Sequence, residues 1–158
     1  MSGIQSLLAI GAIWLFALVS INFNTTVVHN ISIEVENKVY LTAFSLADDK
    51  IEEIKQKAFD QNTTTGNVPS VINLSPILGP EEAKPNFNDI DDYNNDTTFI
   101  NGLPYLESFV VATKVFYADP SNLELNYGSR SFYKRVEVTV TSKYLSTAVV
   151  LSFIFTMK

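Results

Sequence analysis

The sequence IQSLLAIGAIWLFALVSI, residues 4–21, decides how this chain folds. Apart from one glutamine and two serines it is apolar, and no Asp, Glu, Lys or Arg occurs before Glu34. The chain then continues without a proline into a charged amphipathic segment that extends to residue 58. We predict one helix over both parts, about 55 residues and roughly 80 Å long. A helix of this length and composition is expected to be buried against something other than its own domain.

The predicted helix divides the chain into an apolar stalk, residues 1–33, and an acidic head, residues 34–158. The net charge of −6 lies wholly in the head, which at about 125 residues can bury one modest core. An acidic head with scattered Lys and Arg argues against nucleic acid as a partner. The chain has no cysteine, so it has neither a disulfide framework nor a thiolate metal site.

The apolar segment has three interpretations. A cleaved signal peptide would carry a basic region and a small-residue cleavage site, and the sequence shows no clear example of either. A permanent single-pass anchor is the second, because about 18 to 20 apolar residues span the hydrocarbon core of a bilayer. The third, which we favour, is a helix that lies in the membrane before assembly and in a bundle of identical helices afterwards.

Residues 22–33 (NFNTTVVHNISI) form the weakest part of the predicted helix. Asn, Thr and β-branched residues have poor helix propensity, and Asn and Thr compete with the backbone for hydrogen bonds. Two alternatives fit equally well. The helix unwinds locally near residues 22–30, or tertiary packing overrides the propensity and keeps it intact.

From Val28 onward the apolar positions follow the 3.6-residue period of a helix. Charged residues occupy the remaining positions, which is typical of a half-buried helix that lies on a sheet. We expect this helix to end near Phe59, before a polar run closed by Gly66. The expected buried stripe comprises Val28, Ile31, Val35, Val39, Ala43, Leu46 and Ile54, widened by Tyr40, Phe44 and Ile51.

The rest of the chain predicts an irregular region followed by a sheet. Residues 61–107 hold most of the prolines and form the irregular region. Three strands are predicted at residues 108–117, 132–141 and 147–157, joined as an antiparallel meander. The fold class is therefore α+β, with a long N-terminal helix packed on a small C-terminal antiparallel sheet. The residues expected to face the helix are Phe109, Val111, Thr113, Val115 and Tyr117 in the first strand and Val136, Val138 and Val140 in the second.

Four segments of the sequence carry a resemblance to a known superfamily. They are IEEIKQKAFD at residues 51–60, FNDIDDY at 87–93, KRVEVTVT at 134–141 and VVLS at 149–152. Together with the order of elements, they resemble type IV pilins and pseudopilins, and in particular the minor pilins of the mannose-sensitive haemagglutinin pilus group. The resemblance implies a pilin-like fold and assembly into a filament through the apolar helix.

The N-terminus departs from the pattern of that superfamily. It has no basic leader and no Gly-Phe-Thr-Leu-Ile-Glu processing site. The family glutamate at the fifth mature position is replaced by Gln5, or by Leu8 if numbering starts at Ile4. Neither residue can neutralise the terminal amine of a neighbour, so we expect the register of a filament to come mostly from packing.

We therefore expect a structural subunit of an extracellular pilus-like filament. The alternative is a minor pilin or pseudopilin that primes or tips a type IV pilus or type II secretion assembly while anchored in the inner membrane. A third hypothesis is a bitopic binding domain that never polymerises. The expected partners are identical copies of the chain, the inner membrane before assembly, and the secretion or pilus assembly machinery.

The expected assembly interface lies in the apolar segment. Its small residues would let neighbouring helices approach closely, and its large residues would bury apolar surface. The interface is expected to comprise Ile4, Gln5, Leu7, Leu8, Gly11, Ala12, Trp14, Leu15 and Leu18.

The acidic segment NDIDDYNND, residues 88–96, is a candidate calcium site. Carboxylate oxygens at close spacing are the ligands that Ca²⁺ prefers, and some pseudopilins bind calcium in a related loop. The segment lacks the glycine and distal glutamate of an EF-hand, and Asp and Asn also favour turns for backbone reasons alone. The candidate ligands are Asp89, Asp91, Asp92 and Asp96.

The sequence also bears on two further classes of site. Within the irregular region, Asn62, Asn73 and Asn95 begin N-x-S/T sequons and are candidate glycosylation sites if the chain is exported. A catalytic site is not expected, because the one histidine, His29, has no nucleophile or orienting carboxylate in a nearby motif. We expect no enzymatic activity and no cofactor beyond the candidate Ca²⁺.

Overall fold

The computed structural model describes residues 3–102 and 108–157. The first two residues of the predicted stalk and residues 103–107 of the predicted irregular region lie outside the described residues. The fold is α+β, as predicted, with one long helix and an antiparallel sheet. The elements are α1 (Gly3–Lys55), the 3₁₀ turns η1 (Gln61–Thr63), η2 (Val71–Asn73) and η3 (Asp91–Tyr93), and the strands β1 (Thr97–Ile100), β2 (Phe109–Asp119), β3 (Asn122–Asn126), β4 (Tyr133–Ser142) and β5 (Val149–Thr156).

The chain divides into two compact units, Met1–Lys38 and Val39–Lys158. In the first unit, every described residue of α1 is exposed. The helix runs through residues 22–30 without the local unwinding considered above. The side-chain hydroxyls of Thr25 and Thr26 donate to the carbonyls four residues earlier, at 2.6 and 2.9 Å. These hydroxyls are hydrogen-bonded within the helix, and both residues are exposed.

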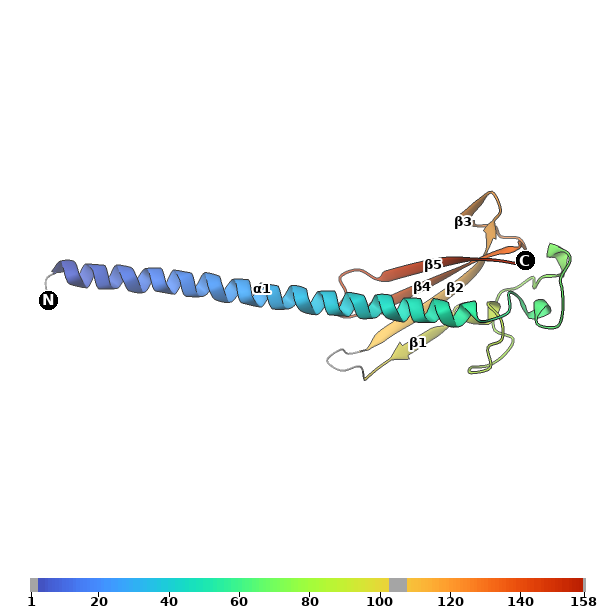
Figure 1. Cartoon of the computed structure of the whole chain (residues 1–158), viewed down its shortest axis with the longest axis horizontal. Helices are drawn as coiled ribbons and strands as arrows, with labels where there is room; N and C mark the ends of the chain where they lie inside the picture. Colours follow the sequence, from blue (N-terminus) through green and yellow to red (C-terminus); the bar gives the residue numbers. More distant parts are fainter. Residues whose placement is uncertain (1–2, 103–107, 158) are drawn as a thin grey trace. The chain divides into compact units, whose positions relative to one another are not determined.

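In the second unit, the C-terminal part of α1 lies across one face of the sheet (Figure 1). Its buried residues are spaced by four and then three positions, as expected for one face of a helix. Alanines at two of these positions allow the helix to approach the strands closely. The buried residues are Val39, Ala43, Ala47, Ile51 and Ile54.

The predicted stripe was wrong at both its start and its width. Val28, Ile31 and Val35 belong to the first unit and are exposed. Tyr40 and Phe44 are also exposed, because they lie on the side of α1 away from the core. Periodicity identified the buried face from Val39 onward, but the earlier residues with the same period are exposed. Ala47, which was not predicted, lies in the core, and Leu46 is only partly buried.

The helix ends at Lys55, four residues before the predicted end. After it, Ala58 forms a parallel bridge with Asp89, in which the N–H of Ala58 donates to Asn88 O at 3.1 Å. The N–H of Ile90 donates to the carbonyl of Ala58 at 3.0 Å. This pairing satisfies the backbone in an extended conformation, so the helix does not continue.

The sheet has the order β1-β2-β4-β5, with antiparallel neighbours, and β3 pairs separately with β2. The three predicted strands correspond to β2, β4 and β5, whereas β1 and β3 were not predicted. In the register, Val111 pairs with Val140 and Val138 pairs with Leu151. All eight residues expected to face the helix are buried, which confirms the predicted alternation.

Candidate functional site

The first candidate site is the surface of α1 in the first unit. Residues 4–21 are apolar around the whole helix, so no polar face is available to meet water. The helix is long and apolar enough to cross a membrane, and none of its most apolar segment is buried within the chain. All nine residues of the expected assembly interface lie on this helix and are exposed; their large aliphatic and aromatic side chains range from 50% exposed at Leu18 to 75% at Leu7.

Gly11 has no packing role within the described chain. A Cβ atom built on it would meet no atom within 4 Å. Its backbone is helical, so the positive φ that favours glycine is not required here either. A glycine costs about 1 kcal/mol relative to alanine inside a helix. No contact among the described residues offsets this cost.

The second candidate site is a buried polar cluster centred on Lys134 of β4. Its ammonium group lies 2.9 Å from Asp60 Oδ2 and 2.5 Å from Asp91 Oδ1, and it donates to the carbonyl of Phe59 at 2.7 Å. The side chains of Lys134, Asp60 and Asp91 are fully excluded from solvent. The ring of Phe59 lies 4.6 Å from the same ammonium and that of Tyr117 lies 5.2 Å away. The cluster thus joins three segments of the second unit that are distant in sequence, those of Asp60, Asp91 and Lys134, next to two aromatic rings.

Asp60 is held as a carboxylate by several donors. Its oxygens accept hydrogen bonds from the backbone and the hydroxyl of Ser75, from the N–H of Asn62 and from the hydroxyl of Tyr117. Burial alone would raise its pKa, but the Lys134 ammonium and these hydrogen bonds outweigh burial and keep the pKa of Asp60 below its ordinary value. Asp60 also caps η1, since its side chain accepts the Asn62 N–H.

Asp91 has a different environment. Only its Oδ1 has a partner, Lys134, whereas its Oδ2 is buried without a hydrogen bond to any described residue. Burial is the main reason that the pKa of Asp91 is raised to about 8, despite the attraction of the Lys134 ammonium. Asp89 and Asp60 raise it further through like charge. One carboxyl beside Lys134 is therefore ionised and the other is protonated at neutral pH.

The remaining aspartates of the acidic segment serve the turn that contains η3. Asp89 Oδ1 accepts the N–H groups of Asp91 and Asp92 at 2.8 and 3.1 Å. Asp92 Oδ2 accepts the N–H of Asn88 at 2.8 Å. Burial raises the pKa of Asp89 to about 6, and its hydrogen bonds only partly oppose that rise. Asp96 faces two lysines instead, forming ion pairs with Lys50 and Lys84.

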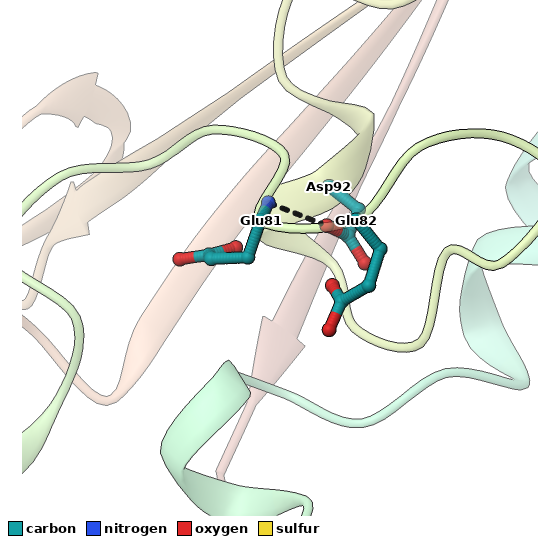
Figure 2. A group of neighbouring side chains, drawn as sticks. All are labelled: Glu81, Glu82 and Asp92. Atoms are coloured by element: carbon teal, nitrogen blue, oxygen red, sulfur yellow. Dashed lines mark hydrogen bonds between the residues drawn. The ribbon is translucent and has the colours of Figure 1, made fainter.

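The four predicted calcium ligands are thus divided among different partners. Asp91 faces Lys134, Asp96 faces Lys50 and Lys84, and the other two accept backbone N–H groups. The acidic residues that do come together are Glu81, Glu82 and Asp92, whose carboxylate oxygens lie within 4.8 Å of one another. Figure 2 shows the N–H of Glu81 pointing at the Asp92 carboxylate, while the Glu81 side chain extends to the other side. Only Asp92 belongs to both sets.

The three sequon asparagines are exposed in the second unit. Asn62 donates its side-chain amide to the carbonyl of Asn73 at 2.8 Å, so these two lie next to each other. Asn95 lies in the turn before β1 with a positive φ of 61°. His29 is exposed on α1.

Sequence reasoning missed Lys134 and Asp60. One signal for Lys134 was present, because it stands two residues before Val136 and therefore shares the inward parity of Val136, Val138 and Val140. A lysine at an inward position of a strand needs a buried partner. Its partners come from segments 74 and 43 residues away, which no local pattern reveals.

Comparisons of the chain with protein-family models, with curated proteins and with solved structures find no match. What the structure itself shows is a long N-terminal apolar helix whose C-terminal part packs on an antiparallel sheet. This architecture is compatible with a pilin-like fold.

Proposed function

We propose that this protein is the structural subunit of an extracellular pilus-like filament and polymerises through its apolar helix. The observation that carries the proposal is that every described apolar residue of α1 in the first unit is exposed. Removing each large apolar side chain from water is worth about 1.5 to 3 kcal/mol. A surface of this kind cannot stay in water, so a partner must cover it.

A membrane alone covers only part of this surface. The uncharged part of α1, residues 3–33, is roughly 46 Å long at 1.5 Å per residue, whereas the hydrocarbon core of a bilayer is about 30 Å thick. Beyond residue 21 the helix still exposes Val28, Ile31 and Ile33. Identical helices side by side would cover both parts, and Gly11 and Ala12 would let them approach closely. In such a contact, one surface of the helix meets a different surface of the next copy. This kind of contact need not close into a ring, so it would build an open polymer.

Before assembly, the proposed location is the inner membrane, with α1 as a single-pass anchor, and assembly would draw on secretion or pilus machinery. In the filament, the apolar helices would form the core and the acidic second unit would face the outside. The role is structural, not catalytic. The four sequence segments that resemble type IV pilins and pseudopilins support the same proposal.

The second candidate is a minor pilin or pseudopilin that primes or tips a type IV pilus or type II secretion assembly. The observation that favours it is the apolar helix that can anchor the chain in a membrane on its own. The two candidates differ in one result. A filament subunit forms long uniform fibres from this chain alone, whereas a priming subunit or an anchored binding domain stays as discrete or membrane-bound particles.

Negative-stain microscopy of the purified full-length chain after detergent removal tests the proposal. We expect uniform fibres from the wild-type chain and none from the Gly11→Glu variant, because a glutamate in the helix bundle would bury an unpaired charge. The matched control is Gly66→Glu in the second unit, where an added Cβ also meets nothing within 4 Å and which should leave fibres intact. Fibres formed by Gly11→Glu, or only monomers from the wild type, would contradict the proposal.

A further inference from the structure

The cluster around Lys134 places a primary amine against two carboxyl groups in the protein interior. Lys134 Nζ is 2.5 Å from Asp91 Oδ1, and the carboxyl carbon lies one bond beyond that oxygen. Asp60 Oδ2 lies 2.9 Å from the same nitrogen on a second approach. All three side chains are fully buried, so water does not compete for the amine or for the acid.

The two carboxyl groups are not equivalent. Asp60 has donors for both of its oxygens, from Ser75, Asn62 and Tyr117, which stabilise it as an anion. Asp91 has one oxygen on Lys134 and a second, Oδ2, that is buried without a hydrogen bond to any residue that the structure describes. An unpaired buried oxygen is costly in a folded protein. The cost disappears if that carboxyl group becomes an amide, because the reaction removes one of its two oxygens.

We propose that Lys134 and Asp91 condense to form an intramolecular amide bond, an isopeptide crosslink, with Asp60 as the proton acceptor for the amine. The product joins β4 to the turn at η3 and closes a loop across 43 positions of the sequence. It also replaces a buried ammonium and a buried carboxyl group with one neutral amide.

The electrostatics of the site match these roles. Condensation requires a protonated carboxyl as the electrophile and an ionised carboxyl as the base. Burial raises the pKa of Asp91 to about 8, so it holds its proton at neutral pH. Although burial also acts on Asp60, the neighbouring ammonium and hydrogen bonds keep the pKa of Asp60 below its ordinary value, so it is ionised.

The atoms and charges balance without a further reagent. Asp60 takes one proton from the Lys134 ammonium, and the free amine then attacks Cγ of the protonated Asp91. The new N–Cγ bond forms, the Cγ–OH bond of Asp91 breaks, and the amine loses a second proton to the departing hydroxyl. The products are one amide, one water molecule and a protonated Asp60, with no oxidant or reductant involved.

Intact mass spectrometry of the denatured full-length chain tests the proposal directly. We expect the wild-type protein to be lighter than its sequence mass by one water molecule. Digestion with trypsin and with a protease that cleaves after glutamate should then release a branched peptide. In this peptide, Lys134 is joined to the segment between Glu82 and Glu107, which contains Asp91. Trypsin should also fail to cleave after Lys134 in this product.

Variants assign the roles. Lys134→Met and Asp91→Ala should each show the full sequence mass, whereas Lys114→Met, which removes an exposed lysine from β2, should keep the loss of water. Asp60→Asn, which keeps the shape but not the charge, should slow the appearance of the lighter species at least tenfold in freshly synthesised protein.

The wild-type measurement keeps the proposal falsifiable even if a variant fails to fold. A folded wild-type chain with its full sequence mass would overturn it. A branched peptide that joins Lys134 to the segment containing Asp60 would overturn the assignment of Asp91 as the electrophile. Crosslinking at the wild-type rate in Asp60→Asn would overturn the role of Asp60. None of these results depends on whether the chain forms filaments.

Discussion

Asp60 and Lys134 are 74 positions apart in the sequence, yet their side chains meet at 2.9 Å with neither exposed to solvent. Asp60 follows α1 and Lys134 lies on β4, so this contact joins the end of the helix to the centre of the second unit. Ser75 and Tyr117 donate to the same carboxylate and bring the loop around η2 and strand β2 to one point. The second unit is therefore held together by a polar centre as well as by its apolar core.

Loss of Asp60 should destabilise the second unit strongly. Asp60→Ala removes the ionised partner of Lys134 and leaves the donors on Ser75 and Tyr117 without an acceptor. We expect a loss of about 3 to 5 kcal/mol in the free energy of unfolding, as for other buried ion pairs that lose one partner. Urea unfolding followed by tyrosine near-UV circular dichroism measures it, since the one tryptophan is Trp14 in the first unit.

The matched control is the exposed ion pair between Glu52 and Lys55. Glu52→Ala should change the free energy of unfolding by less than about 0.5 kcal/mol, because surface pairs gain little in water. Equal losses for Asp60→Ala and Glu52→Ala would show that the buried cluster does not hold the unit together.

The close approach of α1 to the sheet depends on small side chains. Ala47 is fully buried within the core cluster. Ala47→Leu should cost about 1 to 3 kcal/mol, because the three added carbon atoms have no room without moving the helix away from the strands. Ala83→Leu, at an exposed position, is the control and should have little effect on the thermal midpoint. An unchanged midpoint for Ala47→Leu would mean that the contact is looser than the structure shows.

The stability of the second unit should fall as Asp89 ionises. Burial raises the pKa of Asp89 from its ordinary 3.8 to about 6 in the folded state, so over this range the folded state binds more protons than the unfolded state. Its contribution to stability is fully present below the unfolded pKa and is lost as the pH rises through about 6. Asp89→Asn, which is neutral at every pH, should remove this dependence.

We expect Asp89→Asn to raise the free energy of unfolding above the wild-type value by about 1 kcal/mol or more once the pH exceeds the folded pKa. Near the unfolded pKa the two proteins should be equally stable. Thermal melts over this pH range compare them. A difference in stability between the two proteins that is the same at every pH would contradict the raised pKa of Asp89 in the folded state.

Calcium should have little effect on the thermal midpoint. Lys134 Nζ already lies against Asp91, and Lys50 and Lys84 form ion pairs with Asp96, so a divalent cation would have to displace these lysines. Melts with added Ca²⁺ and with a chelator should therefore coincide. A rise in the midpoint with Ca²⁺ would contradict this, and its loss in Glu82→Gln would place the ion beside Glu82 and Asp92 instead.

Local patterns in the sequence were sufficient for the main elements of the fold. The uncharged helix, the inward alternation of Val136, Val138 and Val140, and the antiparallel order of the three long strands were all predicted correctly. Each of these depends on the period of side chains along one segment. Strands β1 and β3, at Thr97–Ile100 and Asn122–Asn126, are too short and too polar to show such a period, and they form because β2 offers them a neighbour.

The extent of the helix contact and the role of the acidic segment were decided by the tertiary structure. The apolar period of α1 continues through Val28 and Val35, but the buried residues of the helix begin at Val39. Where burial begins depends on the packing of the second unit, which the period of the helix does not reveal. The segment around Asp91 predicts a turn or a metal site when considered alone. Its burial is tolerated because Lys134, 43 positions later, donates a hydrogen bond to Asp91 Oδ1 in the protein interior. The sequence alone determined which faces are apolar, whereas pairing between distant segments decided which of those faces, and which charges, are enclosed.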